Sequence, residues 1–257
     1  MFDPGFDIHP DFNTMSFRYG PNAFGPETEK RYLDDIRKSL SDPVAPGPDI
    51  VYSVAMDVGQ AIDREDLLKR NLLYGAMIYA KGQVGKEPIR SQGHIHAISA
   101  SCQSSTPEVY EIWSGSAIIY MQEAAEDQPG RCYAVQANAG EVVIVPEGWA
   151  HCTINTDRTQ EMTFGAWCVR DYGFDYRGIR AHHGIAHFPV YDEAGKLTWQ
   201  ANPAYASSTL KHLSARSYEA IGLRKGVSIY QQYQEKRDLF DFVPHPTRER
   251  YMQYLPE

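Results

Sequence analysis

The middle of the chain consists of short apolar runs separated by turn residues. Each run is rich in Val, Ile, Tyr, Phe or Trp and ends near Gly, Pro, Asn or Ser, which is typical of β-strands joined by tight turns. The predicted strands are residues 51–58, 72–80, 108–113, 117–122, 131–137, 141–146, 151–155 and 162–169. Many short strands at such close spacing predict an all-β sandwich or barrel.

Both ends of the chain have a pattern closer to that of helices. Residues 26–44 begin with Pro and end at an Asp-Pro stop, and one short amphipathic helix is predicted there because the apolar positions fall near helical spacing. These positions are Tyr32, Leu33, Ile36 and Leu40. Residues 207–226 and 230–242 are more charged, and they predict a helical C-terminal part.

The pattern therefore divides the chain into three parts. An N-terminal arm with the short helix occupies residues 1–50, a β barrel occupies residues 51–205, and a helical extension occupies residues 206–257. We expect the arm to pack on the barrel, and the extension to pack on the barrel or on a second subunit. No Gly/Ser linker separates the parts, so a single β domain with helical ends is predicted.

Composition and charge narrow the class of protein. The chain has 257 residues, of which 42% are hydrophobic, and this is enough for a core of ordinary size. Its 33 acidic and 25 basic side chains give a net charge of −8, and no Lys/Arg-rich tract with interleaved aromatic residues is present. A nucleic-acid partner is therefore disfavoured.

The cysteines and the N-terminus indicate the compartment. The four cysteines are widely spaced and form no CxxC pair, so reduced thiols are predicted. The first ten residues, MFDPGFDIHP, lack the basic and apolar regions of a signal peptide, and no apolar run is long enough to span a membrane. We expect a cytoplasmic protein with no membrane partner.

The candidate metal-binding and catalytic residues lie in GHIHA and in the strands that follow it. Side chains at alternate positions of a strand share a face, so His94 lies beside His96, and Glu108 lies beside Tyr110 on the next strand. His151 follows the turn PEGWA and begins another strand. Three histidines and one carboxylate are thereby placed in β segments of one domain.

These four residues suit a divalent cation. Imidazole nitrogen binds Fe²⁺, Mn²⁺, Zn²⁺ or Ni²⁺, and one carboxylate removes one of the two positive charges. Four protein ligands on a six-coordinate metal leave two positions for water or for adjacent substrate oxygens. An HxH pair or a strand Glu alone is more often an ordinary surface feature, but the combination with a turn-flanked third histidine favours a metal site.

The chain resembles the cupin-type glucose-6-phosphate isomerases, which are small β-barrel metalloenzymes. The resemblance extends from about residue 25 to about residue 205. Its most specific motifs are KGQVGKE (81–87), SQGHIHA (91–97), PEVYEIWSG (107–115), AIIYMQ (117–122) and AGEVVIVPEGWAHCTIN (139–155), with weaker matches in DYGFDYRG (171–178) and GKLTWQANP (195–203). The fold implied is a cupin jelly roll, a double-stranded β-helix barrel with helical extensions at both ends.

The resemblance also implies an activity and a set of site residues. A metal-dependent aldose–ketose isomerase acting on glucose 6-phosphate and fructose 6-phosphate is expected, with Fe²⁺ as the expected ion and a homodimer as the expected assembly. The implied metal ligands are His94, His96, Glu108 and His151. Glu108 and Tyr110 are the implied catalytic residues, with Glu108 as base, and the implied substrate-binding residues are Ser91, Gly93, Tyr110 and Tyr176.

Departures from the family pattern leave other functions open, and one of them is a family tyrosine that aligns near Trp167 or Cys168. Met77 occupies about the position of a phosphate-contacting threonine, Phe174 stands where the family has a histidine, and residues 97–107 contain roughly five extra residues that a surface loop can absorb. Alternatives are an isomerase or epimerase of an unphosphorylated sugar, a cupin dioxygenase and a sugar-binding protein without activity. The arginines near the motifs are candidate phosphate ligands: Arg90, Arg170, Arg177 and Arg180.

A second metal site at HHGIAH is disfavoured. His182, His183 and His187 have no carboxylate or cysteine at matching spacing.

Overall fold

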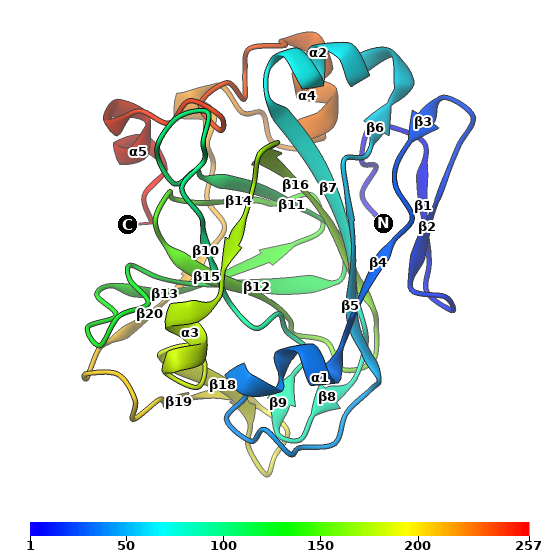
Figure 1. Ribbon diagram of the computed structural model, residues 1–257. Helices are drawn as coiled ribbons and strands as arrows, with labels where there is room; N and C mark the ends of the chain where they lie inside the picture. Colours follow the sequence, from blue (N-terminus) through cyan, green and yellow to red (C-terminus); the bar gives the residue numbers. More distant parts are fainter. Residues whose placement is uncertain (257) are drawn as a thin grey trace.

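Two β-sheets form the centre of the molecule and share one core (Figure 1). The computed structural model describes residues 1–256. In sheet order, the six antiparallel strands of the larger sheet are β14 (Val142–Val145), β11 (Glu108–Ser114), β16 (Met162–Val169), β7 (Leu72–Tyr79), β5 (Ile50–Met56) and β4 (Glu29–Tyr32). The four strands of the smaller sheet are β15 (Ala150–Asn155), β12 (Ser116–Gln122), β13 (Cys132–Asn138) and β20 (Leu210–Ser214).

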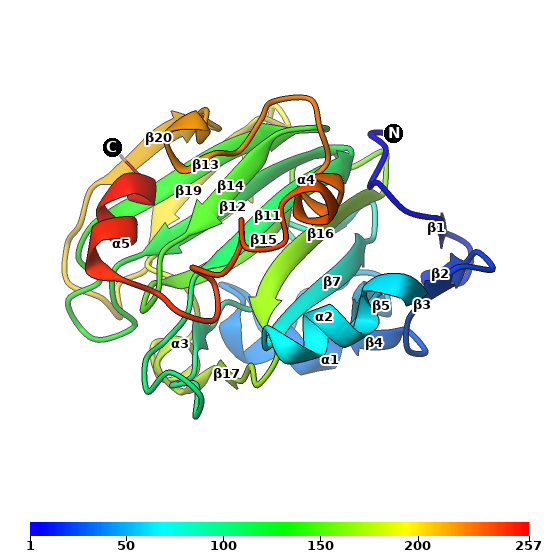
Figure 2. The same cartoon turned by 90° about the horizontal axis from the view of Figure 1, so that it is seen from above.

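The predicted all-β fold is confirmed. Each of the predicted strands overlaps one observed strand, in chain order β5, β7, β11, β12, β13, β14, β15 and β16. From β11 to β16 the chain passes from one sheet to the other at each connection except the β12–β13 hairpin, and this places the sheets face to face in the manner of a jelly roll (Figure 2). The chain therefore has the architecture that its turn spacing indicates.

Alternation along β12 shows how the smaller sheet is covered on both faces. Ala117, Ile119 and Met121 belong to the core between the sheets, whereas Ile118 and Tyr120 belong to a second apolar cluster on the outer face. That outer cluster is completed by side chains from α3 (Arg177–Ala181) and from β18 (His187–Tyr191), which pairs with β19 (Leu197–Ala201). The smaller sheet is thus covered on both of its faces.

The larger sheet is also covered on its outer face. α2 (Arg64–Lys69) and α4 (Ile229–Glu235) lie together over it at the top of Figure 1. Trp167 of β16 stacks on Tyr230 of α4 with ring centroids 5.5 Å apart. Because both faces are covered, β7 and β16 are buried along their whole lengths, which explains their nearly continuous apolar sequences.

The remaining elements are short and lie around the two sheets. The strands are β1 (Ile8–Asp11), β2 (Ser16–Tyr19), β3 (Ala23–Phe24), β6 (Gly59–Gln60), β8 (Gln83–Val84), β9 (Glu87–Pro88), β10 (Ile95–His96) and β17 (Phe174–Asp175). The helices are α1 (Leu33–Ile36), α5 (Arg248–Tyr254) and the 3₁₀ turns η1 (Arg37–Ser39), η2 (Ala61–Asp63) and η3 (Glu219–Ile221). Among residues 1–256, no helix has the length and apolar character needed to cross a membrane.

The prediction of one helix over residues 26–44 is wrong in its extent. Residues Glu29–Tyr32 form β4, which pairs with β5, and only Leu33–Ile36 continue as an α-helix before a 3₁₀ turn. Leu33 and Ile36 are buried as their spacing indicated. Pairing with the open edge of β5 therefore outweighs the helical preference of the preceding residues.

The C-terminal part differs from its prediction in the same way. Residues Leu210–Ser214, expected to be helical, form β20 and run parallel to β13. In residues 230–242 only the first half is helical, as part of α4, while α5 forms in the proline-containing end. The division at residues 50 and 205 stays a prediction, although β4 and β20 show that strands of the sheets lie outside residues 51–205.

Candidate metal centre

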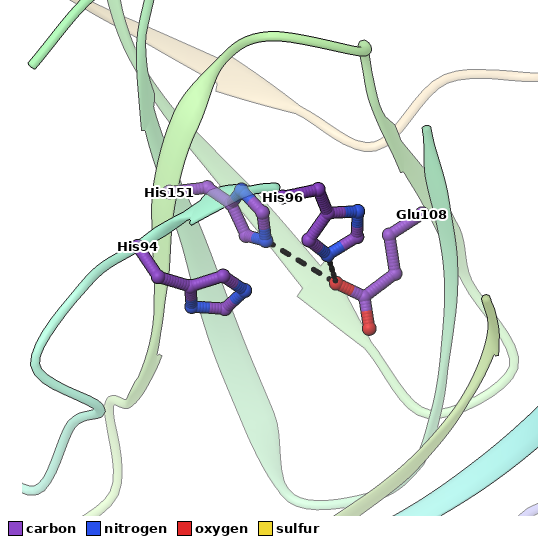
Figure 3. Close-up of side chains that lie close together, drawn as sticks. All are labelled: His94, His96, Glu108 and His151. Carbon is purple, nitrogen blue, oxygen red and sulfur yellow. Dashed lines mark hydrogen bonds and ion pairs between the residues drawn. The ribbon is translucent and has the colours of Figure 1, made fainter. Parts of the chain in front are cut away.

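The four predicted ligand residues come together between the two sheets (Figure 3). Glu108 begins β11 of the larger sheet, and His151 lies in β15 of the smaller sheet. His96 lies in the short strand β10, and His94 lies just before that strand. Their donor atoms all lie within 4.8 Å of one another. His96, Glu108 and His151 are buried, and His94 is partly buried.

The backbone around His94 fixes its position. His94 donates its backbone N–H to the carbonyl of His151 at 3.1 Å, and His151 donates back to His94 at 2.9 Å. Gly93 precedes this bridge with a φ of 93°, where a side chain is strained and a Cβ would lie 3.1 Å from a methyl group of Ile185. The rings of His94 and His96 lie side by side, with centroids 5.4 Å apart, as the HxH spacing predicts.

Hydrogen bonds behind the rings select the tautomers of two histidines. Nδ1 of His96 lies 2.9 Å from the carbonyl oxygen of Thr106, and Nδ1 of His151 lies 3.0 Å from that of Trp149. A carbonyl oxygen only accepts, so Nδ1 carries the hydrogen and Nε2 of the neutral ring presents a lone pair. Both Nε2 atoms lie 3.2 Å from Oε2 of Glu108. Lone pairs that face a carboxylate at this distance suit a bound cation.

The charge states of the other two donors fit a cation as well. Burial lowers the pKa of His94 well below its usual value, and the neighbouring histidines lower it further, so this ring is neutral. Its Nε2 atom is buried without a hydrogen-bond partner. Burial alone would raise the pKa of Glu108, but His151 and His96 hold it well below its usual value, so Glu108 is ionised. Three imidazoles and one carboxylate match a divalent ion.

Two further side chains hold the carboxylate of Glu108. Tyr110 donates its hydroxyl to Oε2 at 2.6 Å, and the Cys168 thiol donates to Oε1 at 3.2 Å. Burial raises the pKa of both Tyr110 and Cys168 well above their usual values, so each keeps its hydrogen. Sequence reasoning did not connect Cys168 with Glu108. The connection follows from register, because Val109 pairs with Trp167 across β11 and β16.

A cavity of about 530 Å³, including the part open to solvent, adjoins this cluster. Among the predicted substrate-binding residues, Ser91, Tyr110 and Tyr176 line it, whereas Gly93, which precedes His94 in the chain, does not. Two of the departures from the family pattern, Met77 and Phe174, also line it. The ring of Phe174 lies 4.4 Å from that of His94 between centroids. The complete lining is Arg31, Tyr52, Val54, Met56, Met77, Tyr79, Ser91, His94, Glu108, Tyr110, Thr153, Phe164, Phe174 and Tyr176.

The arginines singled out from the sequence do not line this cavity. Arg90 is fully buried and donates to Glu87, Ser91 and Ser39. Arg170 donates to Asp57 and to the carbonyl of Leu72. Arg177 is paired with Asp175 while its side chain is 90% exposed, and Arg180 donates to Gln92. Arg31 was missed because residues 26–44 were predicted to be helical, whereas β4 places Arg31 at the cavity.

The extra residues between the HxH pair and Glu108 form a loop that is only partly at the surface. Residues 97–107 contain no helix or strand. Ser99 and Ser101 donate to the carboxylate of Asp171, and Ser99 is buried. The hydroxyl of Ser105 accepts the backbone N–H of Gly148 at 2.9 Å. The loop is therefore attached to the turn that precedes His151.

Comparisons with known proteins give consistent results. The sequence model of the family described as "Glucose-6-phosphate isomerase (GPI)" matches residues 39–207. A protein of Pyrococcus abyssi named glucose-6-phosphate isomerase is 31% identical over 213 residues, which cover 80% of this chain and 100% of that protein. A protein of Sinorhizobium medicae with the same name is 32% identical over 156 residues, which cover 58% of this chain and 68% of that protein.

Likeness to solved structures is weaker. A structure of oxalate oxidase has a TM-score of 0.37 and 14% identity to this chain, and the match covers 53% of this chain and 59% of that one.

Proposed function

Since the chain belongs to the glucose-6-phosphate isomerase family, we propose that it interconverts glucose 6-phosphate and fructose 6-phosphate in the cavity beside Glu108. The observation that carries this proposal is the convergence of three imidazoles and one carboxylate at the cavity, with donor atoms within 4.8 Å of one another. His94, His96, Glu108 and His151 are the residues that hold the metal ion. Fe²⁺ is the ion we expect, and Mn²⁺, Zn²⁺ and Ni²⁺ suit the same donors.

When bound, the divalent ion supplies Lewis acidity to the C1 and C2 oxygens of the open-chain sugar. The isomerisation moves a hydrogen between C1 and C2 and a proton between the two oxygens. We assign the first transfer to Glu108, which takes the proton from one carbon and returns it to the other. Its pKa lies well below the usual value, so it is ionised at neutral pH, which is the form that can act as a base. Oε2 faces His96, His151 and Tyr110, which leaves Oε1, held by the Cys168 thiol, as the oxygen that takes the proton.

Tyr110 and Tyr176 bind and orient the sugar. Tyr110 keeps its hydroxyl hydrogen and donates it to Oε2 of Glu108, so it connects the base with the cavity that both line. Tyr176 faces the same cavity, with its ring centroid 5.9 Å from that of His94. The hydroxyl of Ser91 and the backbone at Gly93 complete the substrate contacts that we propose. Met77 and Phe174 exclude water from the reacting carbons.

The test is a coupled assay on the purified, metal-analysed protein. The protein is loaded in turn with Fe²⁺, Mn²⁺ or Zn²⁺, and fructose 6-phosphate is compared with unphosphorylated aldoses and ketoses. Turnover of fructose 6-phosphate to glucose 6-phosphate is the expected result. Turnover of free sugars alone would overturn the substrate assignment and keep the reaction class. No turnover of either substrate by metal-loaded protein would overturn both.

The proposal includes an assembly and a location. We expect a cytoplasmic protein. We also expect a homodimer, because closed twofold pairs are the commonest assemblies of soluble proteins. Static light scattering at micromolar concentration should then give twice the chain mass of 29.1 kDa. A mass equal to one chain would refute the dimer.

A further inference from the structure

Arg31 is the cationic side chain in the cavity wall. Among the described residues that line the cavity, it is the one Lys or Arg, and Glu108 is the one acidic residue. Arg31 lies in β4 directly opposite Tyr52 of β5, and its side chain is 22% exposed. Its charge is therefore partly shielded from solvent and faces the space in which a small ligand binds.

Neutral hydroxyl groups surround this charge. The guanidinium of Arg31 lies close enough to Tyr52 to offset in part the burial that raises the Tyr52 pKa. The ring of Tyr52 stacks on that of Tyr79 with centroids 4.9 Å apart, and burial also raises the pKa of Tyr79 well above its usual value. Ser91 lies beside Tyr79 on the same wall. Each of these hydroxyls is a hydrogen-bond donor at neutral pH, so the group suits an anion.

The present partner of Arg31 is easily displaced. Arg31 is paired with Glu29, which lies two residues earlier in β4 and whose side chain is 65% exposed. An ion pair with so exposed a partner contributes little free energy, since water and salt compete for it. Glu29 does not line the cavity. A dianionic phosphate that enters from the cavity side can therefore replace the carboxylate at the guanidinium.

The other nearby cations cannot play this part. Arg90 uses its donors inside the protein and is fully buried, and Arg170 donates to Asp57 and to the carbonyl of Leu72. Arg180 donates to Gln92 and stacks on the ring of Tyr176, but it does not line the cavity itself. Met77 lines the cavity but offers no donor. Without Arg31, a phosphate in this cavity would lack a cationic side chain.

We infer that Arg31 binds the phosphate group of the sugar phosphate, with Tyr52, Tyr79 and Ser91 as neutral donors beside it. The inference rests on the proposed function. The sugar then lies with its phosphate at β4 and its carbonyl end at Glu108 and His94. Arg31 is in consequence a determinant of specificity, because an unphosphorylated sugar makes no use of it.

The test compares Arg31→Met, Arg31→Lys and the control Arg177→Met, which removes an arginine that is outside the cavity. We expect Arg31→Met to raise the KM for fructose 6-phosphate roughly 10- to 100-fold, the usual effect of losing a charge-assisted hydrogen bond. The kcat should change little, Arg31→Lys should be intermediate, and Arg177→Met should match the wild type. An unchanged KM in a folded Arg31→Met protein would overturn the inference.

A binding readout separates the phosphate site from catalysis. Chelator-treated protein is melted with and without fructose 6-phosphate, and the ligand should raise the Tm of the wild type and Arg177→Met but not that of Arg31→Met. An equal rise in all three proteins would overturn the inference.

A third variant, Glu29→Gln, distinguishes phosphate binding from a purely structural ion pair. If Glu29 only competes for Arg31, its removal should lower the KM for fructose 6-phosphate about two- to fivefold. A rise in KM like that of Arg31→Met would mean that the pair acts as one structural unit, and the inference would fail. The proposed function fails separately, because wild-type protein would then show no turnover of fructose 6-phosphate at all.

Discussion

The two oxygens of Glu108 have different neighbours, and this difference assigns their roles. Oε2 receives the Tyr110 hydroxyl at 2.6 Å and lies 3.2 Å from Nε2 of His96 and of His151. Oε1 accepts a hydrogen bond from the thiol of Cys168. We therefore expect the Tyr110 hydroxyl to orient the proposed base, Glu108, and its loss to affect turnover more than metal binding.

For Tyr110→Phe we expect kcat to fall roughly 10- to 100-fold, because one hydrogen bond to an ionised group is lost while the ring still fills its place. Metal content by elemental analysis should remain that of the wild type. Tyr120→Phe is the matched control, since Tyr120 is equally buried but donates to Gln122 outside the cavity. A Tyr110→Phe enzyme with wild-type kcat would contradict an orienting role for the hydroxyl.

Among the elements, β11 connects the cavity with helix α4 through its opposite face. Glu111 is fully buried and accepts the backbone N–H of Ile229, at the start of α4, at 2.8 Å and the indole N–H of Trp113 at 3.2 Å. Burial raises the pKa of Glu111 to about 8, against the lowering effect of these two bonds. The packing of α4 on the sheet is therefore expected to depend on pH.

The sign of this pH dependence follows from the pKa of Glu111 in the folded and in the unfolded state. The folded protein keeps the Glu111 proton up to about pH 8, whereas the unfolded chain releases it near its usual value of 4.5. The stabilising contribution is complete below the unfolded pKa and is lost as pH rises toward the folded one, by at most about 1.4 kcal/mol per pH unit. Urea denaturation between pH 5 and 8 should show this decline in the free energy of unfolding.

The same titration of Glu111→Gln should show a smaller decline, while the exposed control Glu65→Gln should follow the wild type. Identical pH dependence in wild type and Glu111→Gln would assign the decline to other groups.

The elements also show how far sequence can predict this structure. The central strands were predictable because β-branched and aromatic runs end at turn residues, and the HxH spacing placed two rings side by side. β4 and β20 were not, because their extended form depends on pairing with β5 and β13, which are distant in sequence. The missed strand β4 is also why Arg31 was overlooked. The contact of Cys168 with Glu108 likewise depends on a register that no local pattern contains.

For the whole molecule, the metal centre connects the two sheets. Glu108 belongs to the larger sheet and His151 to the smaller one, and His94 is bridged to His151 by two backbone hydrogen bonds. Separating the sheets would separate these donors, so the unfolded chain cannot bind the ion in the same way. Metal binding should therefore stabilise the entire fold and not only the cavity.

The size of this effect can be measured by thermal unfolding. Metal at one hundred times its dissociation constant contributes about 2.7 kcal/mol, which for a chain of this length corresponds to a rise in Tm of roughly 5–10 °C. A chelator should reverse the rise. In His94→Gln, which removes the donor atom that has no other partner, the rise should be largely lost, whereas His9→Gln, with a side chain 64% exposed, should behave as the wild type. If His94→Gln kept both the rise and full metal content, the ion would be bound elsewhere, and the link between the sheets would have to come from packing alone.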